Sequence, residues 1–229
     1  MTSDAYFAVK RSFDVLVSLV LLVVLAPLLL AIALGVRLES TGPALFRQER
    51  LGARRVRTGG GWTWQVRTFT IVKFRTMHTA CDEELHRRYM AAYLAGDEAA
   101  MAALRPSGGK GDSYKLVGDP RVTRFGRLLR RFSLDELPQI LNVLRGDMSL
   151  VGPRPPLPYE ADLYEEWHFE RLASAPGLTG WWQVNGRCET SFEEMVRLDL
   201  EYIARRSLWL DLRILARTLP AAFSARGAG

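Results

Sequence analysis

Two adjacent carboxylates, Asp135 and Glu136, are the residues of this chain whose types and spacing best suit chemistry. Carboxylates can attack phosphorus, hold a divalent cation or move protons. A structural interpretation competes, because Ser133 and Glu136 have the spacing of a capping box and acidic residues are favoured in a helix's first turn. Pro138 argues against a cap at Ser133, since proline is comfortable only near a helix start, and favours Asp135 as the cap. The segment alone leaves both interpretations open.

Cationic and amide side chains elsewhere in the chain indicate that this pair handles phosphate. One arginine stands between two prolines, whose restricted backbone can present the planar guanidinium fork to a phosphate. A Gly-rich turn over residues 176–187 ends in another arginine, and a lysine and an arginine stand at the end of a predicted strand. Phosphate oxygens are the usual partners of such groups. The candidates for substrate contact are Lys73, Arg75, Arg154, Gln183 and Arg187.

An uncharged run over residues 15–36 predicts a membrane segment. As a straight helix it would measure about 33 Å, enough to cross the roughly 30 Å hydrocarbon layer. A secretory signal peptide is disfavoured by the length of the run and by the lack of a cleavage pattern after it. Pro27 interrupts the run and basic residues flank both of its ends, which favours a re-entrant helix that breaks at Ala26-Pro27 over a simple span. Asp14, at its start, is interpreted as a charge that favours a helix N-terminus.

The remaining chain predicts strands and surface helices around the site. Residues 45–51 and 66–74 are expected to pair as a short β-hairpin with a flexible Gly-rich connection, and a phase shift at Val72 predicts a bulge or the end of the strand. Residues 81–104 predict one helix. Two stretches mix arginines with apolar residues, as is typical of helices at a lipid headgroup surface, and for the second of them ordinary core packing is the alternative; they cover residues 121–132 and 208–219.

The predicted fold class is therefore α+β and mainly helical. We expect a membrane-embedded re-entrant helix over residues 1–40, and a compact cytoplasmic catalytic domain with interfacial amphipathic helices over residues 41–229. The formal net charge of +6 indicates phosphate-bearing partners, membrane lipids among them. No nucleic-acid reader motif is present, so nucleic acid is not expected. Cys81 and Cys188 lack C-x-x-C spacing, which predicts neither a disulfide framework nor a zinc site.

A series of short motifs, in order along nearly the whole chain, carries a resemblance to a known family. They are KRSFD (10–14), GPALFRQER (42–50), KFRTM (73–77), DPR (119–121), SLDELPQ (133–139), NVLRGDMS (142–149), VGPRP (151–155), TGW (179–181) and NGR (185–187). With these motifs the sequence resembles the bacterial sugar transferases, the monotopic phosphoglycosyl transferases. It departs from them at Ala26, where the family often has serine, at Trp182, and in longer segments over 58–65 and about 79–117.

The resemblance implies a two-step reaction. Asp135 would attack the sugar-side phosphorus of a UDP-sugar and release UMP, and polyprenyl (undecaprenyl) phosphate would then take the phosphosugar. Mg²⁺ would be held by Asp135 and Glu136 together with substrate phosphates, with Glu136 serving either as a metal ligand or as a base. The implied setting is the bacterial inner membrane, with the active site facing the cytoplasm, at the first membrane step of exopolysaccharide, capsule or glycoconjugate synthesis. The alternative is a non-enzymatic membrane adaptor that binds anionic lipids or a partner protein.

Overall fold

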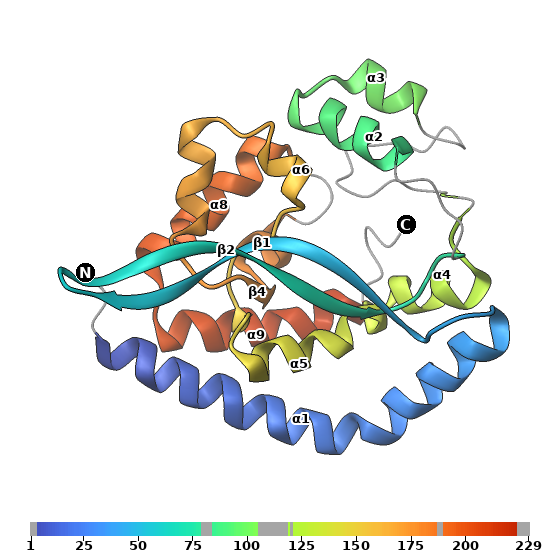
Figure 1. Cartoon of the computed structure of the whole chain (residues 1–229), viewed down its shortest axis with the longest axis horizontal. Coiled ribbons are helices and arrows are strands. Elements are labelled where there is room, and N and C mark those ends of the chain that lie inside the picture. Colours follow the sequence, from blue (N-terminus) through green and yellow to red (C-terminus); the bar gives the residue numbers. More distant parts are fainter. Residues whose placement is uncertain (1–3, 79–83, 105–118, 120, 187–189, 224–229) are drawn as a thin grey trace.

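The computed structural model describes residues 4–78, 84–104, 119, 121–186 and 190–223 of the chain. Helix α1 (Asp4–Glu39) lies along one side of the molecule as a bow whose two ends turn toward the rest of the protein (Figure 1). The predicted break at Ala26-Pro27 is wrong, because the helix continues through Pro27. A proline inside a helix removes one backbone hydrogen bond and bends the helix without having to end it.

Helix α1 leaves most of its apolar surface uncovered by protein. Within the described residues it is the one helix long and apolar enough to cross a membrane, judged by length and composition. Val23 is 75% exposed and Leu30 is 72% exposed, whereas Ile32 and Val36 are buried on the face that packs against the body. Exposed aliphatic side chains on this scale are typical of a surface that meets lipid or another protein.

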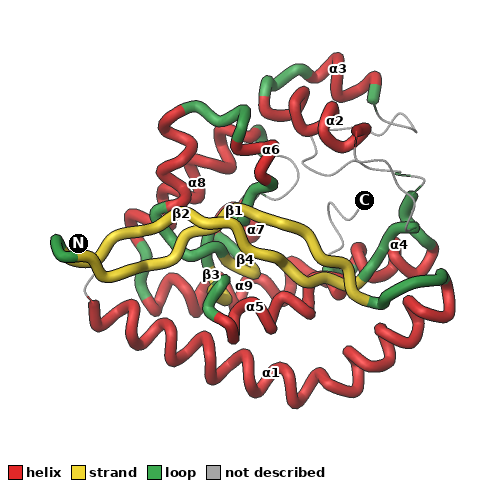
Figure 2. The backbone as a smooth tube through the Cα atoms, in the orientation of Figure 1, coloured by secondary structure: helices red, strands yellow, loops and turns green. Residues whose placement is uncertain are grey.

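A long β-hairpin crosses the molecule above α1 (Figure 2). Strands β1 (Leu45–Thr58) and β2 (Gly61–Phe74) pair antiparallel without interruption, from the Leu45–Phe74 pair to the Thr58–Gly61 pair. The hairpin is longer than predicted, because the Gly-rich segment forms a tight turn in which Gly61 adopts φ +119°. The phase shift at Val72 marks neither a bulge nor the end of the strand, because the register runs unbroken through Val72 to Phe74. Ile71 and Val72 are both buried because the sheet is covered on both faces there.

The other segments that were predicted to be helical do contain helices, but their bounds differ from the predicted ones. Residues 81–104 contain two helices, α2 (Glu84–Leu94) and α3 (Glu98–Ala103), so the prediction of one helix is wrong. Gly96 at φ +66° ends the first, and the Asp97 side chain accepts a hydrogen bond from the Ala100 amide to start the second. Thr123 caps the basic helix α4 (Arg124–Arg131) in the same manner.

The elements that surround the site come next along the chain. They are the 3-10 helix η1 (Leu134–Gln139), α5 (Ile140–Arg145), β3 (Ser149–Val151), α6 (Pro158–Ala161), the 3-10 helix η2 (Glu166–Leu172), β4 (Gly177–Thr179), α7 (Trp181–Asn185), α8 (Phe192–Arg205) and α9 (Leu208–Phe223). Strands β3 and β4 form a small parallel pair. One apolar core joins the hairpin, α5, β3 and the last two helices, and a second joins α2, α3 and α8. The α+β, mainly helical fold class is confirmed.

Candidate active site

The segment that carries the two carboxylates has an unusual backbone. Ser133 adopts φ 56° and ψ 23°, and it is the one non-glycine residue with positive φ among those described. An N-cap needs an extended backbone, and the Ser133 side chain makes no capping hydrogen bond. The capping-box interpretation of Ser133 and Glu136 is therefore wrong. Residues held in the left-handed region cost of order 1–3 kcal/mol and cluster at functional sites.

Glu136 lies between two cations. Its Oε1 atom is 3.2 Å from Nζ of Lys73 and 3.6 Å from Nη1 of Arg154, and its side chain is 18% exposed. The pKa of Lys73 is lowered to about 8, chiefly by burial and in part by the neighbouring Arg154 and Arg50, while the Glu136 carboxylate opposes the shift. The lysine therefore titrates near neutral pH, and at pH 7 it is largely charged.

Asp135 is half-buried beside this group, within the field of two cations. Its charge favours the charged forms of Arg130, on α4, and of Lys73, on β2. The Nε atom of Arg130 donates to Oγ1 of Thr76 at 2.9 Å, so the guanidinium is held at the end of the hairpin. The two adjacent carboxylates thus face positive charge from three separate parts of the chain.

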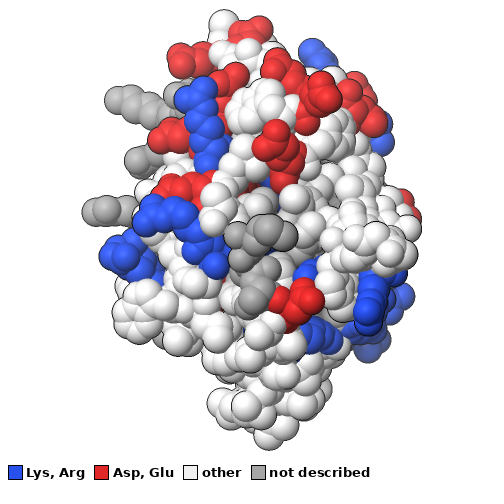
Figure 3. Space-filling view, turned by 90° about the vertical axis from the view of Figure 1, so that its left-hand side faces the viewer, with Lys and Arg blue, Asp and Glu red and all other residues white. Residues whose placement is uncertain are grey.

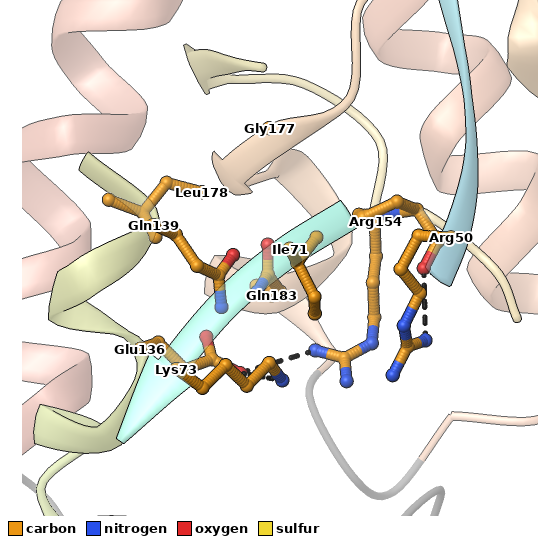
Figure 4. Close-up of a pocket in the computed structure, with 10 residues that line it drawn as sticks. Arg50, Ile71, Lys73, Glu136, Gln139, Arg154, Gly177, Leu178 and Gln183 are labelled. Atoms are coloured by element: carbon orange, nitrogen blue, oxygen red, sulfur yellow. Dashed lines mark hydrogen bonds and ion pairs between the residues drawn. The ribbon is translucent and has the colours of Figure 1, made fainter. Parts of the chain in front are cut away.

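A small cavity brings most of the predicted substrate-contacting residues together (Figure 4). Lys73, Glu136, Arg154 and Gln183 line it, and Asp135 is not among its lining residues. The other lining residues are Arg50, Ile71, Gln139, Pro155, Gly177 and Leu178. Arg187 lies outside the described residues.

Arg75 lies elsewhere. Its guanidinium donates to the backbone carbonyl oxygens of Thr41, Ser40 (2.8 Å) and Gly42 (3.4 Å), where α1 has just ended. These three carbonyl groups lie in the segment just after α1, which ends at Glu39, and the Arg75 guanidinium gives each of them a hydrogen-bond donor. The structure does not bring Arg75 to the cavity, and its predicted role in substrate binding stays a prediction.

Two tightly packed turns present Arg154 and Gln183. The Gly152 amide donates to the Thr179 carbonyl at 2.9 Å, and the Gly177 amide donates to the Pro153 carbonyl at 2.8 Å. A Cβ atom on either glycine would clash with the opposing backbone, so this approach requires glycine. The sequence showed both turns, but their contact could not be seen before the fold was known.

A buried ion pair supports the Arg154 turn from behind. Arg171 and Asp199 pair at 2% and 1% exposure, and Arg171 also donates to the carbonyl oxygen of Arg154 at 3.3 Å. Both charges are fully desolvated, and a pair of this kind stabilises the fold only while both partners are present. The presentation of Arg154 therefore depends on residues distant in sequence.

Asp14 links α1 to the strand that leads into this turn. Its carboxylate accepts from the Ser149 hydroxyl at 2.8 Å and from the Leu150 amide at 3.2 Å. The interpretation of Asp14 as a charge at a helix N-terminus is wrong, because α1 begins at Asp4 and Asp14 is buried in its third turn. The bond couples the apolar helix to the active-site framework.

The sequence-based reasoning missed Arg50 and Gln139. Both line the cavity and both are buried, at 5% and 4% exposure. Arg50 closes the motif at residues 42–50, and Gln139 closes the motif at 133–139, so the resemblance was the available signal. A metal site of conventional composition is absent, since no group of three or more His, Cys, Asp or Glu side chains occurs in the described ranges. Asp135 and Glu136 suit Mg²⁺ only if substrate phosphates complete its ligands.

Comparison with known proteins finds similarity over nearly the whole length of the chain. Residues 5–225 match the sequence model of the bacterial sugar transferase family. The chain is 40% identical over 218 residues to the exopolysaccharide production protein ExoY of Sinorhizobium fredii, across 95% of this chain and 87% of that protein. It is 44% identical over 220 residues to the UDP-glucose:undecaprenyl-phosphate glucose-1-phosphate transferase of Caulobacter vibrioides, across 93% of this chain and 68% of that protein. It is 36% identical over 219 residues to the undecaprenyl-phosphate galactose phosphotransferase of Salmonella typhimurium, across 96% and 41% respectively.

Proposed function

The chain belongs to the bacterial sugar transferase family, and we propose that it moves a sugar 1-phosphate from a UDP-sugar to undecaprenyl phosphate. The observation that carries the proposal is the carboxylate pair: Asp135 stands beside Glu136, which is held between Lys73 and Arg154 at a cavity with cationic walls. A diphosphate donor is attracted by such a cavity, and the Asp135 carboxylate, next to the lining residue Glu136, can act as the nucleophile.

In the first step, a carboxylate oxygen of Asp135 forms a bond to the sugar-side phosphorus of the donor. The bond between that phosphorus and the bridging oxygen breaks, and its electron pair leaves on the phosphate of UMP. In the second step, a phosphate oxygen of undecaprenyl phosphate attacks the same phosphorus, and the bond to Asp135 breaks. The product is a lipid-linked diphosphate sugar, and the carboxylate is restored for the next turnover.

The surrounding cations make the first step feasible. An anionic carboxylate must approach an anionic diphosphate, so repulsion between negative charges contributes much of the barrier. Lys73 and Arg154 reduce this repulsion, and they are already in place before the donor arrives because Glu136 holds both. Glu136 acts here as a positioning residue for the two cations.

Mg²⁺ is part of the proposal. Asp135 and Glu136 would hold it together with phosphate oxygens, and it would withdraw charge from the diphosphate.

The membrane setting is supported by the distribution of charge. Figure 3 shows an uncharged lower end of the molecule, with Lys and Arg side chains above it and acidic side chains mostly at the opposite end. That arrangement suits a protein seated among anionic headgroups on the cytoplasmic side of the inner membrane. A re-entrant α1 would leave cysteines placed by Asp4→Cys and Thr41→Cys reactive from the same side of sealed vesicles. Labelling from opposite sides would establish a simple span.

The substitution Asp135→Asn tests the enzymatic proposal. It keeps the size of the side chain and removes the nucleophile, so release of UMP from UDP-glucose or UDP-galactose should fall to background while the protein still inserts into membranes. Asp162→Asn, at an exposed acid, is the matched control and should leave turnover unchanged. Undiminished UMP release by Asp135→Asn would remove Asp135 from the mechanism. Vesicle binding by the unaltered protein without any UMP release would favour the adaptor alternative.

A further inference from the structure

Arg50 is a buried arginine of the cavity, and no acidic side chain of the described residues pairs with it. Its side chain is 5% exposed and comes from the middle of β1. Its guanidinium donates from Nη1 to the Pro155 carbonyl at 3.1 Å and from Nη2 to Oε1 of Gln48 at 2.9 Å, and both acceptors are neutral. Its Nε–H group has no hydrogen-bond partner within the described part of the chain, which also offers it no carboxylate at ion-pairing distance.

A buried cation in this condition is unfavourable unless something else compensates its charge. Charged side chains are almost never fully buried without a partner, because transfer out of water costs several kcal/mol per ion. The Leu51 amide already bonds the Pro156 carbonyl at 2.9 Å, so the contact between β1 and the proline turn does not depend on Arg50 alone. A structural role thus accounts for little of its burial, and an anionic ligand accounts for it directly.

The charges of the cavity match such a ligand. Three cations, Arg50, Lys73 and Arg154, line it against the single carboxylate of Glu136. Glu136 pairs with Lys73 and Arg154 and leaves Arg50 uncompensated. A diphosphate ester brings two negative charges to this positively charged lining.

The order of these groups indicates which phosphate each one meets. Figure 4 shows Glu136, Arg154 and Arg50 in that order across the cavity, with Lys73 beside Glu136. Asp135 adjoins Glu136 in the chain, so the reacting, sugar-side phosphorus belongs at that end. Arg50 stands at the far end, where the nucleotide-side phosphate must lie.

We propose that Arg50 binds the nucleotide-side phosphate of the donor, where negative charge develops as UMP leaves. This inference rests on the proposed function and adds a leaving-group contact to it. Arg50 would hold the UMP phosphate through its Nε–H group and a terminal N–H group, as guanidinium forks bind phosphate elsewhere.

Binding of UMP to the full-length protein in detergent, measured by calorimetry, tests the proposal. Arg50→Met should weaken UMP binding about tenfold to a hundredfold, as expected for loss of a charge-assisted hydrogen bond. The same variant should leave the Tm of the ligand-free protein unchanged or raised, because a costly buried charge has been removed. A purely structural role predicts the reverse, namely a lower Tm and unchanged UMP affinity.

Two variants serve as controls. Arg54→Met removes an exposed arginine from the same strand and should bind UMP as the unaltered protein does. Arg50→Lys keeps the charge without the fork and should lose part of the affinity, which also covers the case in which Arg50→Met fails to fold. Affinity for UMP within twofold of the unaltered protein in both Arg50 variants would overturn the inference. Failure of the unaltered protein to bind UMP would instead contradict the donor class in the proposed function.

Discussion

Lys73 should impose an alkaline limit on activity well below the range of an ordinary lysine. Burial lowers its pKa from 10.5 to about 8, with Arg154 and Arg50 adding to the shift and Glu136 opposing it. Above that pKa the charged fraction falls about tenfold for each pH unit, to about one-tenth at pH 9. Because a neutral amine cannot offset the charge of the donor, kcat/KM should fall with the same slope.

Stability should change in the opposite direction over the same range. The pKa of Lys73 is lower in the folded protein than in the unfolded chain, so the unfolded chain binds more protons between pH 8 and 10.5. The contribution of Lys73 to the free energy of unfolding therefore rises with pH across that window, by about 3 kcal/mol at most. Activity lost near pH 9 would then not reflect unfolding.

The assay is UMP release at subsaturating UDP-sugar between pH 6.5 and 10, with Tm recorded in each buffer. Lys73→Arg supplies the comparison, because arginine stays charged throughout this range and should remove the alkaline limb or move it upward. A profile that stays flat to pH 9.5 in the unaltered protein would refute the pKa reasoning. The same limb in Lys73→Arg would assign the titration to another group.

Two further predictions concern the framework and the metal. Asp199→Asn leaves the Arg171 guanidinium buried without its anion and should lower the free energy of unfolding by about 3–5 kcal/mol, measured by denaturant titration. Glu193→Gln, in the exposed pair with Arg197, is the control and should change it by less than about 1 kcal/mol; equal effects would contradict the argument. Chelation of divalent cations should abolish UMP release and Mg²⁺ should restore it, whereas full activity in chelator would exclude the metal from the reaction.

Features encoded by local patterns could be predicted from the sequence. The uncharged run of α1 and the alternating residues of the hairpin depend on neighbours a few positions away, so they were found, although the strands proved longer. The gathering of Lys73, Glu136, Arg154 and Gln183 at one cavity followed from interpreting each motif as a phosphate contact.

Features that depend on packing could not be predicted. Lys73 and Arg75 are two positions apart and would share a face of a continuing strand, but β2 ends at Phe74 and Arg75 turns to the end of α1 instead. The spacing of Ser133 and Glu136 indicated a cap, yet the ion pairs of Glu136 with residues 63 and 18 positions away determine where its side chain lies. Arg50 reaches the cavity only because the hairpin crosses the proline turn.

The central claim is that the carboxylate of Asp135 carries the phosphosugar between the two steps. Intact-protein mass spectrometry after incubation with UDP-glucose or UDP-galactose, without a lipid acceptor, tests it most directly. We expect the mass of the intact protein to increase by one hexose phosphate, which digestion should locate on the peptide that contains Asp135. One UMP per protein should be released, and the adduct should be lost when undecaprenyl phosphate is added. Transfer to the lipid without any adduct, at acceptor concentrations low enough to slow the second step, would contradict the account and indicate direct displacement.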